Sequence, residues 1–161
     1  MKFIADCMLG KLARWLRLLG YDTAYKTFAE DDDLLILSAA EGRILLTRDG
    51  PLAKRAPKGM CLYIDYGELD DQVAQMVLEL GISLEGEPFT RCLTCNTLIR
   101  PLSREDAQGR VPDYIYQTRE IFFDCPDCLH VYWRGTHVDR MDERLAKIKD
   151  RVATYLREKG I

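Results

Sequence analysis

The sequence predicts a small parallel α/β domain, followed by a cysteine-rich module and a C-terminal helix. Three observations lead to this fold class. Apolar runs alternate with segments of helical periodicity over about the first 80 residues, as in repeated β-α units around a parallel sheet. Two Cys-x-x-Cys pairs follow, and the last part of the chain carries a long apolar stripe at helical spacing. We expect these three parts to span residues 1–84, 88–137 and 138–161.

Four short apolar runs are expected to form the strands of the α/β domain. They are Lys2–Ala5, Thr23–Lys26, Arg43–Thr47 and Met60–Ile64. The third is an almost continuous run of Ile, Leu and Thr, which is typical of a buried parallel strand.

Helices are expected between and after these strands, at residues 9–19, 31–41, 51–56 and 69–80. Gly20 and Gly42 are expected to end the first two helices, because glycine readily adopts the left-handed conformation found there. Asp31 is expected to cap the start of the second helix.

The cysteine-rich module begins after a boundary at Gly81–Phe89. We expect strands at Tyr114–Gln117, Ile121–Phe123 and Val131–Trp133, with a hairpin over Arg110–Gln117 in the long spacer between the cysteine pairs. The terminal helix, at about 139–159, has a longer apolar stripe than such a module can cover. It is therefore expected to pack on the α/β domain or to pair with a second copy of the chain.

Composition limits the class of protein. Hydrophobic residues make up 47% and charged residues 30% of the 161 residues, so the chain can bury a core. No apolar run approaches the roughly 20 residues of a membrane span, and the N-terminus lacks the apolar core of a signal peptide. We therefore expect a cytoplasmic location. The net charge of −3 does not indicate a domain that coats nucleic acid.

Charge is unevenly divided along the chain. Residues 1–87 carry 10 basic and 15 acidic side chains, whereas residues 88–161 carry 13 and 11. This asymmetry indicates two parts with different functions.

Acidic residues follow three of the expected strands. Asp6, Asp49 and Asp65 lie at or near strand ends, and Asp31 opens the helix after the remaining strand. Because parallel strands deliver their carboxyl ends to one edge, these carboxylates are expected to gather and to be neutralised by Mg²⁺ or Mn²⁺. Such a cation polarises a phosphodiester and activates water, as in a metal-dependent nuclease. The alternative is that each acid is a helix cap or turn residue.

Four cysteines form a predicted metal site. Cys92, Cys95, Cys125 and Cys128 supply four thiolates, which suit a closed tetrahedral zinc site of structural type. Iron in a rubredoxin-like site and a redox dithiol are the rival interpretations. His130 and His137 are interpreted as surface or nucleic-acid contacts rather than ligands. Cys7 and Cys61 stand alone in apolar surroundings and are expected to be buried thiols.

Two groups of residues have the chemistry of an RNA contact. Lys11, Arg14 and Arg17 recur every three residues in the first helix and either hold phosphates or form an ordinary solvated face. Tyr132, Trp133, Arg134 and His137 combine aromatic surface with positive charge, which suits single-stranded RNA. The alternative is that these aromatic residues pack the module against its neighbour.

Several motifs together resemble a known family. The first stretch is Phe3-Ile4-Ala5-Asp6, followed by Leu9-Gly10-Lys11-Leu12-Ala13-Arg14-Trp15-Leu16-Arg17-Leu18-Leu19-Gly20-Tyr21-Asp22. The second runs from Asp31-Asp32-Asp33-Leu34-Leu35 to Glu41-Gly42-Arg43-Ile44-Leu45-Leu46-Thr47-Arg48-Asp49, and the third is Tyr132-Trp133-Arg134-Gly135-Thr136-His137. The chain resembles the PIN-like ribonucleases with a C-terminal zinc ribbon, named for the C-terminal RNase domain of the Mut-seven exonuclease. The resemblance covers nearly the whole chain.

The resemblance implies a PIN-like fold, RNA cleavage with a divalent metal, and roles for particular residues. The family's acids match Asp6, Asp31, Asp49 and, at its most variable position, Asp65. Asp32 and Asp33 leave the register of the second acid open, and Thr47 is expected to hydrogen-bond within the site. Arg14 and Arg48 are the favoured RNA contacts among the basic residues.

Two hypotheses of function follow. The first is a metal-dependent ribonuclease whose zinc ribbon binds substrate or a partner. The second is a non-catalytic adaptor that binds RNA, the ribosome or another protein through the ribbon. Binding of Mn²⁺ or Mg²⁺ at the carboxylates, in addition to the ribbon metal, distinguishes the first from the second.

Overall fold

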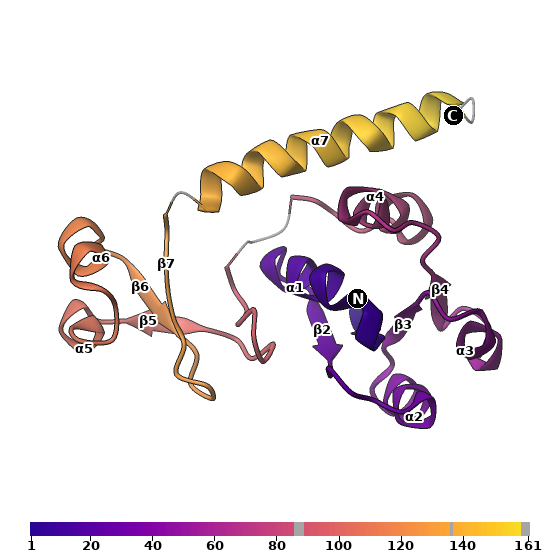
Figure 1. Cartoon of the computed structure of the whole chain (residues 1–161), viewed down its shortest axis with the longest axis horizontal. Helices are drawn as coiled ribbons and strands as arrows, with labels where there is room; N and C mark the ends of the chain where they lie inside the picture. The colour runs from indigo at the N-terminus through magenta and orange to yellow at the C-terminus, as the bar shows by residue number, and fades with distance from the viewer. Residues whose placement is uncertain (86–88, 136, 159–161) are drawn as a thin grey trace.

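The computed structural model describes residues 1–85, 89–135 and 137–158, with the side chains of all of these except 137–140. The chain forms an α/β domain (residues 1–85) and a cysteine module (residues 89–135) that lie side by side (Figure 1). The long helix α7 (His137–Glu158) leaves the cysteine module and runs back across the α/β domain.

A four-stranded sheet forms the centre of the α/β domain. All of its strands are parallel, in the order β2-β1-β3-β4. The strands are β1 (Lys2–Ala5), β2 (Asp22–Tyr25), β3 (Ile44–Thr47) and β4 (Cys61–Tyr63). The parallel sheet is confirmed, and each strand lies within one residue of its expected start and two of its expected end.

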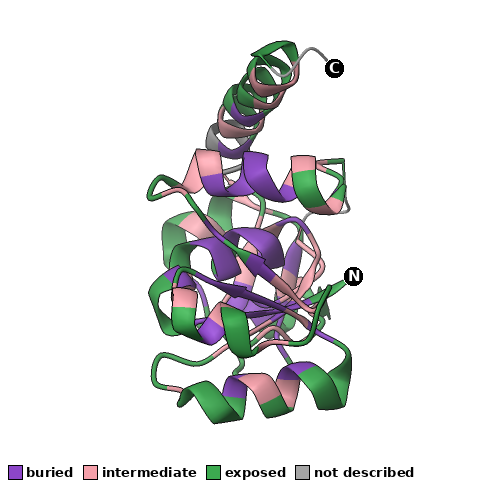
Figure 2. Cartoon of the chain, turned by 90° about the vertical axis from the view of Figure 1, so that its right-hand side faces the viewer, coloured by how far each residue is buried: buried purple, intermediate pink, exposed green. Residues whose placement is uncertain are grey.

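Helices cover both faces of this sheet. They are α1 (Gly10–Leu18), which follows a short 3-10 helix (Cys7–Leu9), α2 (Asp31–Glu41), α3 (Gly50–Arg55) and α4 (Leu69–Leu80). Side chains alternate along β1, so that Phe3 and Ala5 pack with α1 and α4, whereas Ile4 packs with α2 and α3. Buried residues therefore gather in the sheet and on the inner helix faces, and the outer faces are exposed (Figure 2).

The two ends of α2 differ in how closely they follow the expected local chemistry. Gly42 has a φ of +62° and accommodates the left-handed turn that ends α2, as expected. Asp31 is not the cap of α2, because Glu30 occupies that position without a side-chain hydrogen bond and Asp31 is the first helical residue. There its negative charge lies next to the positive end of the helix dipole.

The cysteine module has a second sheet of three antiparallel strands in the order β5-β6-β7. They are β5 (Arg100–Leu102), β6 (Phe122–Asp124) and β7 (Val131–Trp133). The expectation of a strand at Tyr114–Gln117 and a hairpin over Arg110–Gln117 is wrong. The spacer instead forms two short helices, α5 (Arg104–Ala107) and α6 (Asp113–Thr118).

Tertiary packing explains these short helices. Ala107, Val111, Phe122 and Val131 form a small buried cluster, and Ile115 and Tyr116 of α6 pack against it. In a strand, neighbouring side chains point to opposite faces, so Ile115 and Tyr116 would not both reach this cluster. The β-propensity of Tyr-Ile-Tyr is overridden by this packing.

Helix α7 packs on α4, which is the first of the two alternatives expected for it. Met141 and Ile148 are buried in the main core beneath it. Ion pairs join Arg144 to Asp70 and Arg151 to Asp71, both across to α4. Neither α7 nor any other helix in the described part of the chain is long and apolar enough to cross a membrane.

Candidate functional site

Two acidic residues lie at the C-terminal edge of the sheet. Asp6 follows β1 and Asp49 follows the neighbouring strand β3. The hydroxyl of Thr47 donates a 2.7 Å hydrogen bond to Asp6 Oδ2 and accepts one of 2.9 Å from the backbone N–H of Asp49. Thr47, expected to hydrogen-bond within the site, therefore connects the two acids.

Both acids are fixed by the start of the segment that follows them. Asp6 is only 5% exposed, and its Oδ1 accepts a 2.6 Å hydrogen bond from the N–H of Cys7. Asp49 caps α3, because its Oδ1 accepts a 2.9 Å hydrogen bond from the N–H of Leu52. Capping is therefore one role of Asp49, while its second carboxylate oxygen has no hydrogen bond to a described residue.

Asp31 and Asp65 have other partners. The carboxylate of Asp31 lies 3.5 Å from Arg55 of α3, which also forms an ion pair with Asp32. Asp65 follows β4, and its Oδ2 accepts a 3.1 Å hydrogen bond from the side chain of Gln75. One oxygen of Asp31 is thus already near a cationic side chain.

The three basic residues of α1 differ in environment. Lys11 and Arg14 are exposed, whereas Arg17 is only 4% exposed. The guanidinium of Arg17 donates hydrogen bonds of 2.8–3.1 Å to backbone carbonyls of Thr23, Leu93 and Thr94.

Neither interpretation of the basic stripe holds for Arg17, which neither faces solvent nor is available to a phosphate. Burial lowers the pKa of Arg17, and the neighbouring cysteine thiolates oppose this shift. The sequence signal for burial was its place one turn after Ala13 on the apolar side of α1.

Four cysteine sulfurs converge in the cysteine module. The Sγ atoms of Cys92, Cys95, Cys125 and Cys128 all lie within 4.8 Å of one another. Two of the separations are 3.5 Å (Cys92 to Cys128) and 3.4 Å (Cys95 to Cys125). Tetrahedral ligands about 2.3 Å from zinc are about 3.8 Å apart, so this cluster fits a closed zinc site.

The two cysteine pairs adopt the same turn. In each, the N–H after the second cysteine donates to the carbonyl of the first, from Asn96 to Cys92 (2.9 Å) and from Leu129 to Cys125 (3.0 Å). In each, the N–H of the second cysteine points to the sulfur of the first, at 3.4 Å and 3.5 Å. Asn96 and Leu129 both have positive φ, of 73° and 60°. Two copies of one turn thus present four sulfurs to a common centre.

Hydrogen bonds at Cys92 favour a thiolate. Burial acts to raise the pKa of Cys92, but the Tyr132 hydroxyl and backbone N–H groups outweigh it and lower the pKa to about 6. The same Tyr132 hydroxyl lies 3.1 Å from Cys92 Sγ and accepts a 3.1 Å hydrogen bond from the N–H of Leu93. Thiolates are the form that binds metal.

A polar network joins the cysteine module to the α/β domain. Asp22 of β2 accepts hydrogen bonds from Arg43 (2.6 Å) and from the side chain of Asn96 (2.8 Å), and the N–H of Thr23 donates to Asn96 Oδ1 (3.0 Å). Burial by itself would raise the pKa of Asp22. The hydrogen bonds from Arg43 and Asn96 have the larger effect, so the pKa of Asp22 lies below its usual value. The first cysteine turn is therefore hydrogen-bonded to the edge strand of the parallel sheet.

The remaining predicted residues have varied positions. Arg48, Arg134 and His130 are exposed, and Trp133 is half-buried against the small cluster of the cysteine module. Thr136 and the side chain of His137 lie outside the described residues. The expectation of a buried Cys7 is wrong, since it is exposed beside Asp6, and Cys61 is only partly buried at the sheet edge.

The chain combines a parallel α/β domain with a module in which four cysteine sulfurs converge. A family model for the Mut7-C RNAse domain matches residues 1–145. The chain belongs to the Mut7-C RNAse domain family, and this membership gives it a ribonuclease-type function with RNA as the substrate class. No curated protein and no solved structure matches the chain at a significant level.

Proposed function

We propose that the chain is a divalent-metal-dependent ribonuclease that hydrolyses RNA phosphodiester bonds at the edge occupied by Asp6 and Asp49. The observation that carries this proposal is a pair of hydrogen bonds at the ends of the two central strands. The Thr47 hydroxyl donates to the Asp6 carboxylate and accepts from the backbone N–H of Asp49. Parallel α/β sheets bind ligands at this edge. Carboxylates at such an edge suit a hard cation such as Mg²⁺ or Mn²⁺, and Asp6 is buried there.

In this proposal Asp6, Asp49 and Asp31 hold the cation, and Asp65 lies at the rim. The cation, when bound, supplies Lewis-acid activation of the phosphodiester and of the attacking water. Thr47 fixes the orientation of Asp6, and the start of α3 fixes Asp49. Lys11 and Arg48, both exposed, are proposed to hold phosphates of the RNA on either side of the acids.

The four cysteines are proposed to hold structural zinc. A closed tetrahedral site leaves no position for substrate, so its contribution is folding energy. The module would then serve to place single-stranded RNA or to bind a partner such as the ribosome, in a cytoplasmic protein. Trp133, Arg134 and His137 are the proposed contacts.

Replacement of Asp6 by Asn tests the catalytic proposal. Asn keeps the size and much of the hydrogen bonding but removes a charged ligand. Cleavage of a single-stranded oligoribonucleotide in Mn²⁺ should fall on the order of 100-fold or more, since even outer partners of metal ligands are worth 10–100-fold. The melting temperature should be kept. Asp142→Asn, an exposed acid on α7, is the matched control and should cleave as the native chain does.

A second candidate function is the non-catalytic adaptor. It is favoured by one observation, namely that Asp49 caps α3 and Asp31 pairs with Arg55, so that both already have structural partners. Metal analysis separates the two functions. The ribonuclease binds Mn²⁺ in addition to zinc and loses only the Mn²⁺ in Asp6→Asn. A chain that binds zinc alone and leaves RNA intact in Mn²⁺ and in Mg²⁺ is the adaptor.

A further inference from the structure

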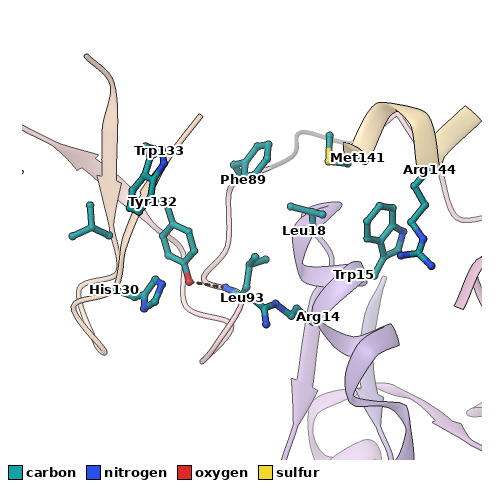
Figure 3. A pocket seen from close by; sticks show the side chains of 11 residues that line it. Arg14, Trp15, Leu18, Phe89, Leu93, His130, Tyr132, Trp133, Met141 and Arg144 are labelled. Atoms are coloured by element: carbon teal, nitrogen blue, oxygen red, sulfur yellow. Dashed lines mark hydrogen bonds between the residues drawn. The ribbon is translucent and has the colours of Figure 1, made fainter. Parts of the chain in front are cut away.

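A cavity of about 400 Å³ lies between the two parts of the molecule. Helix α1 forms one wall, the first cysteine turn and β7 form the opposite wall, and α7 closes one end (Figure 3). Aromatic and basic side chains are prominent in its lining, namely Arg14, Trp15, Phe89, Tyr132, Trp133 and Arg144. The proposed chemistry at the acidic edge uses none of the aromatic residues among them.

The Tyr132 ring, one of the aromatic walls, is held in place at the cysteine cluster. The Tyr132 hydroxyl is fixed by Cys92 and by the N–H of Leu93, so the ring cannot turn away from the cavity without breaking both contacts. The His130 ring packs on it with centroids 5.0 Å apart. Aromatic faces on fixed supports offer stacking surface at little cost in conformational entropy.

Positive charge lies at the rim of the same cavity. Arg14 is exposed and makes no hydrogen bond or ion pair with any residue that the structure describes. Arg144 lies over the Trp15 ring, 5.7 Å from its centroid, and is paired with Asp70. Arg14 is therefore the cation available to an anionic ligand.

We propose that this cavity holds a nucleobase of single-stranded RNA between its aromatic walls, with the adjoining phosphate at Arg14. Stacking surfaces combined with positive charge are the chemistry by which proteins bind single strands. This proposal rests on the proposed ribonuclease function. It deepens that function by giving the single-stranded RNA substrate a binding site apart from the acidic residues.

The position of α1 connects this anchor to the acidic edge. Helix α1 starts just after Asp6 and runs away from it, with Lys11 and Arg14 on one exposed flank. Three residues of helix separate these two by about 4.5 Å along its axis. A strand held at Arg14 is thereby directed past Lys11 towards Asp6 and Asp49.

Tryptophan fluorescence tests the proposal, because both tryptophans of the chain, Trp15 and Trp133, line this cavity. The zinc-loaded full chain with Asp6→Asn is titrated with a short single-stranded oligoribonucleotide. We expect saturable quenching. The same oligonucleotide with abasic sugars keeps the phosphates and should bind about 5- to 150-fold more weakly, which is the range for loss of one stacked base.

Two variants separate stacking from charge. Trp133→Ala should weaken binding within the same range and leave the salt dependence unchanged, while Trp133→Phe should restore most of the affinity. Arg14→Ala should make the negative slope of log K against log salt less steep by about 0.7, the value for one phosphate contact on a single strand. Tyr114→Ala and Arg157→Ala, both exposed and outside the cavity, are the matched controls and should bind normally. Zinc content verifies that the cysteine module of each variant is folded, and amide hydrogen exchange verifies the α/β domain.

The outcomes are distinguishable from those of the catalytic test. Binding without quenching, or equal binding of the abasic strand, overturns the cavity proposal even where Asp6→Asn abolishes cleavage. Normal affinity in both Trp133→Ala and Arg14→Ala overturns it as well. Quenching together with undiminished cleavage by Asp6→Asn supports the cavity and rejects the acids as the catalytic site.

Discussion

The α/β domain and the cysteine module achieve a stable fold by different means. The α/β domain, together with α7, buries a large apolar core on one face of its sheet and a smaller one on the other. In the cysteine module, the buried apolar cluster of the described residues has four members. The four cysteine sulfurs form a second centre, in which Cys92 and Cys125 are buried and Cys95 and Cys128 are exposed. A module of this size cannot bury enough apolar surface to fold alone. A metal held by the four cysteines, as proposed above, would replace apolar burial as its main source of stability.

Loss of the metal is expected to have the largest effect and to be confined to one part. Cys92→Ser, or removal of zinc by a chelator, should unfold residues 89–135, because zinc contributes on the order of 10 kcal/mol to such sites. The α/β domain should remain folded. Amide hydrogen exchange measured segment by segment checks both statements. Cys7→Ser, at an exposed thiol, is the control and should leave both parts folded. Simultaneous unfolding of both parts after zinc removal would contradict the idea that they are stabilised by different means.

Removal of apolar volume should have the next largest effect, on the α/β side. Ile148 of α7 is fully buried in the main core, so Ile148→Ala should cost about 2–5 kcal/mol in the free energy of unfolding. Urea denaturation measures this value. Lys147→Ala, next to it and exposed, should change stability by less than about 0.5 kcal/mol. A small loss at Ile148 would mean that α7 is not part of the core.

The junction between the two parts should show a smaller effect. Arg17→Met keeps the aliphatic stem and removes the hydrogen bonds to Thr23, Leu93 and Thr94. The unpaired carbonyls should cost about 1–3 kcal/mol. We also expect unfolding to separate into two transitions in a calorimetric scan. Arg14→Met, at an exposed position of the same helix, should retain native stability, and equal behaviour of the two variants would refute a linking role for Arg17.

The smallest expected effect on stability comes from the residue that ends each cysteine turn, which is Asn96 in the first and Leu129 in the second. Asn96 tolerates its left-handed conformation, whereas Leu129, with φ of 60°, is strained there. Leu129→Asn copies the first turn and should raise the stability of the zinc-loaded module by about 1 kcal/mol. Thermal unfolding measures the gain. Leu98→Asn, also at an exposed leucine but with ordinary φ, should give none.

The sequence was informative where a short segment is sufficient to determine the structure. The alternation of apolar and helical patterns predicted the parallel sheet, and residues 69–80 formed a helix with the expected ends. Spacing alone also identified the four cysteines whose sulfurs converge. Asp6 and Asp49 follow adjacent parallel strands, and Thr47 links the Asp6 carboxylate to the backbone N–H of Asp49. That their carboxylates share one cation stays a prediction. The convergence of Asp31 with them stays a prediction.

Contacts between distant segments decided the rest. The spacer formed α5 and α6 because both pack on one small cluster of the module. Ala107 of α5 belongs to this cluster, and Ile115 and Tyr116 of α6 pack against it. Arg17 became a buried link because Leu93 and Thr94, more than 70 residues away, present their carbonyls to it.

Local periodicity and motif spacing thus determined the elements of the α/β domain, the parallel sheet and the clustering of the four cysteines, since each depends on residues a few positions apart or on a repeated turn. Only the tertiary structure decided the docking of α7, the burial of Arg17 and the aromatic cavity between the two parts. The physical reason is that these features depend on which surfaces of separate elements meet, and that choice is made by packing over the whole chain.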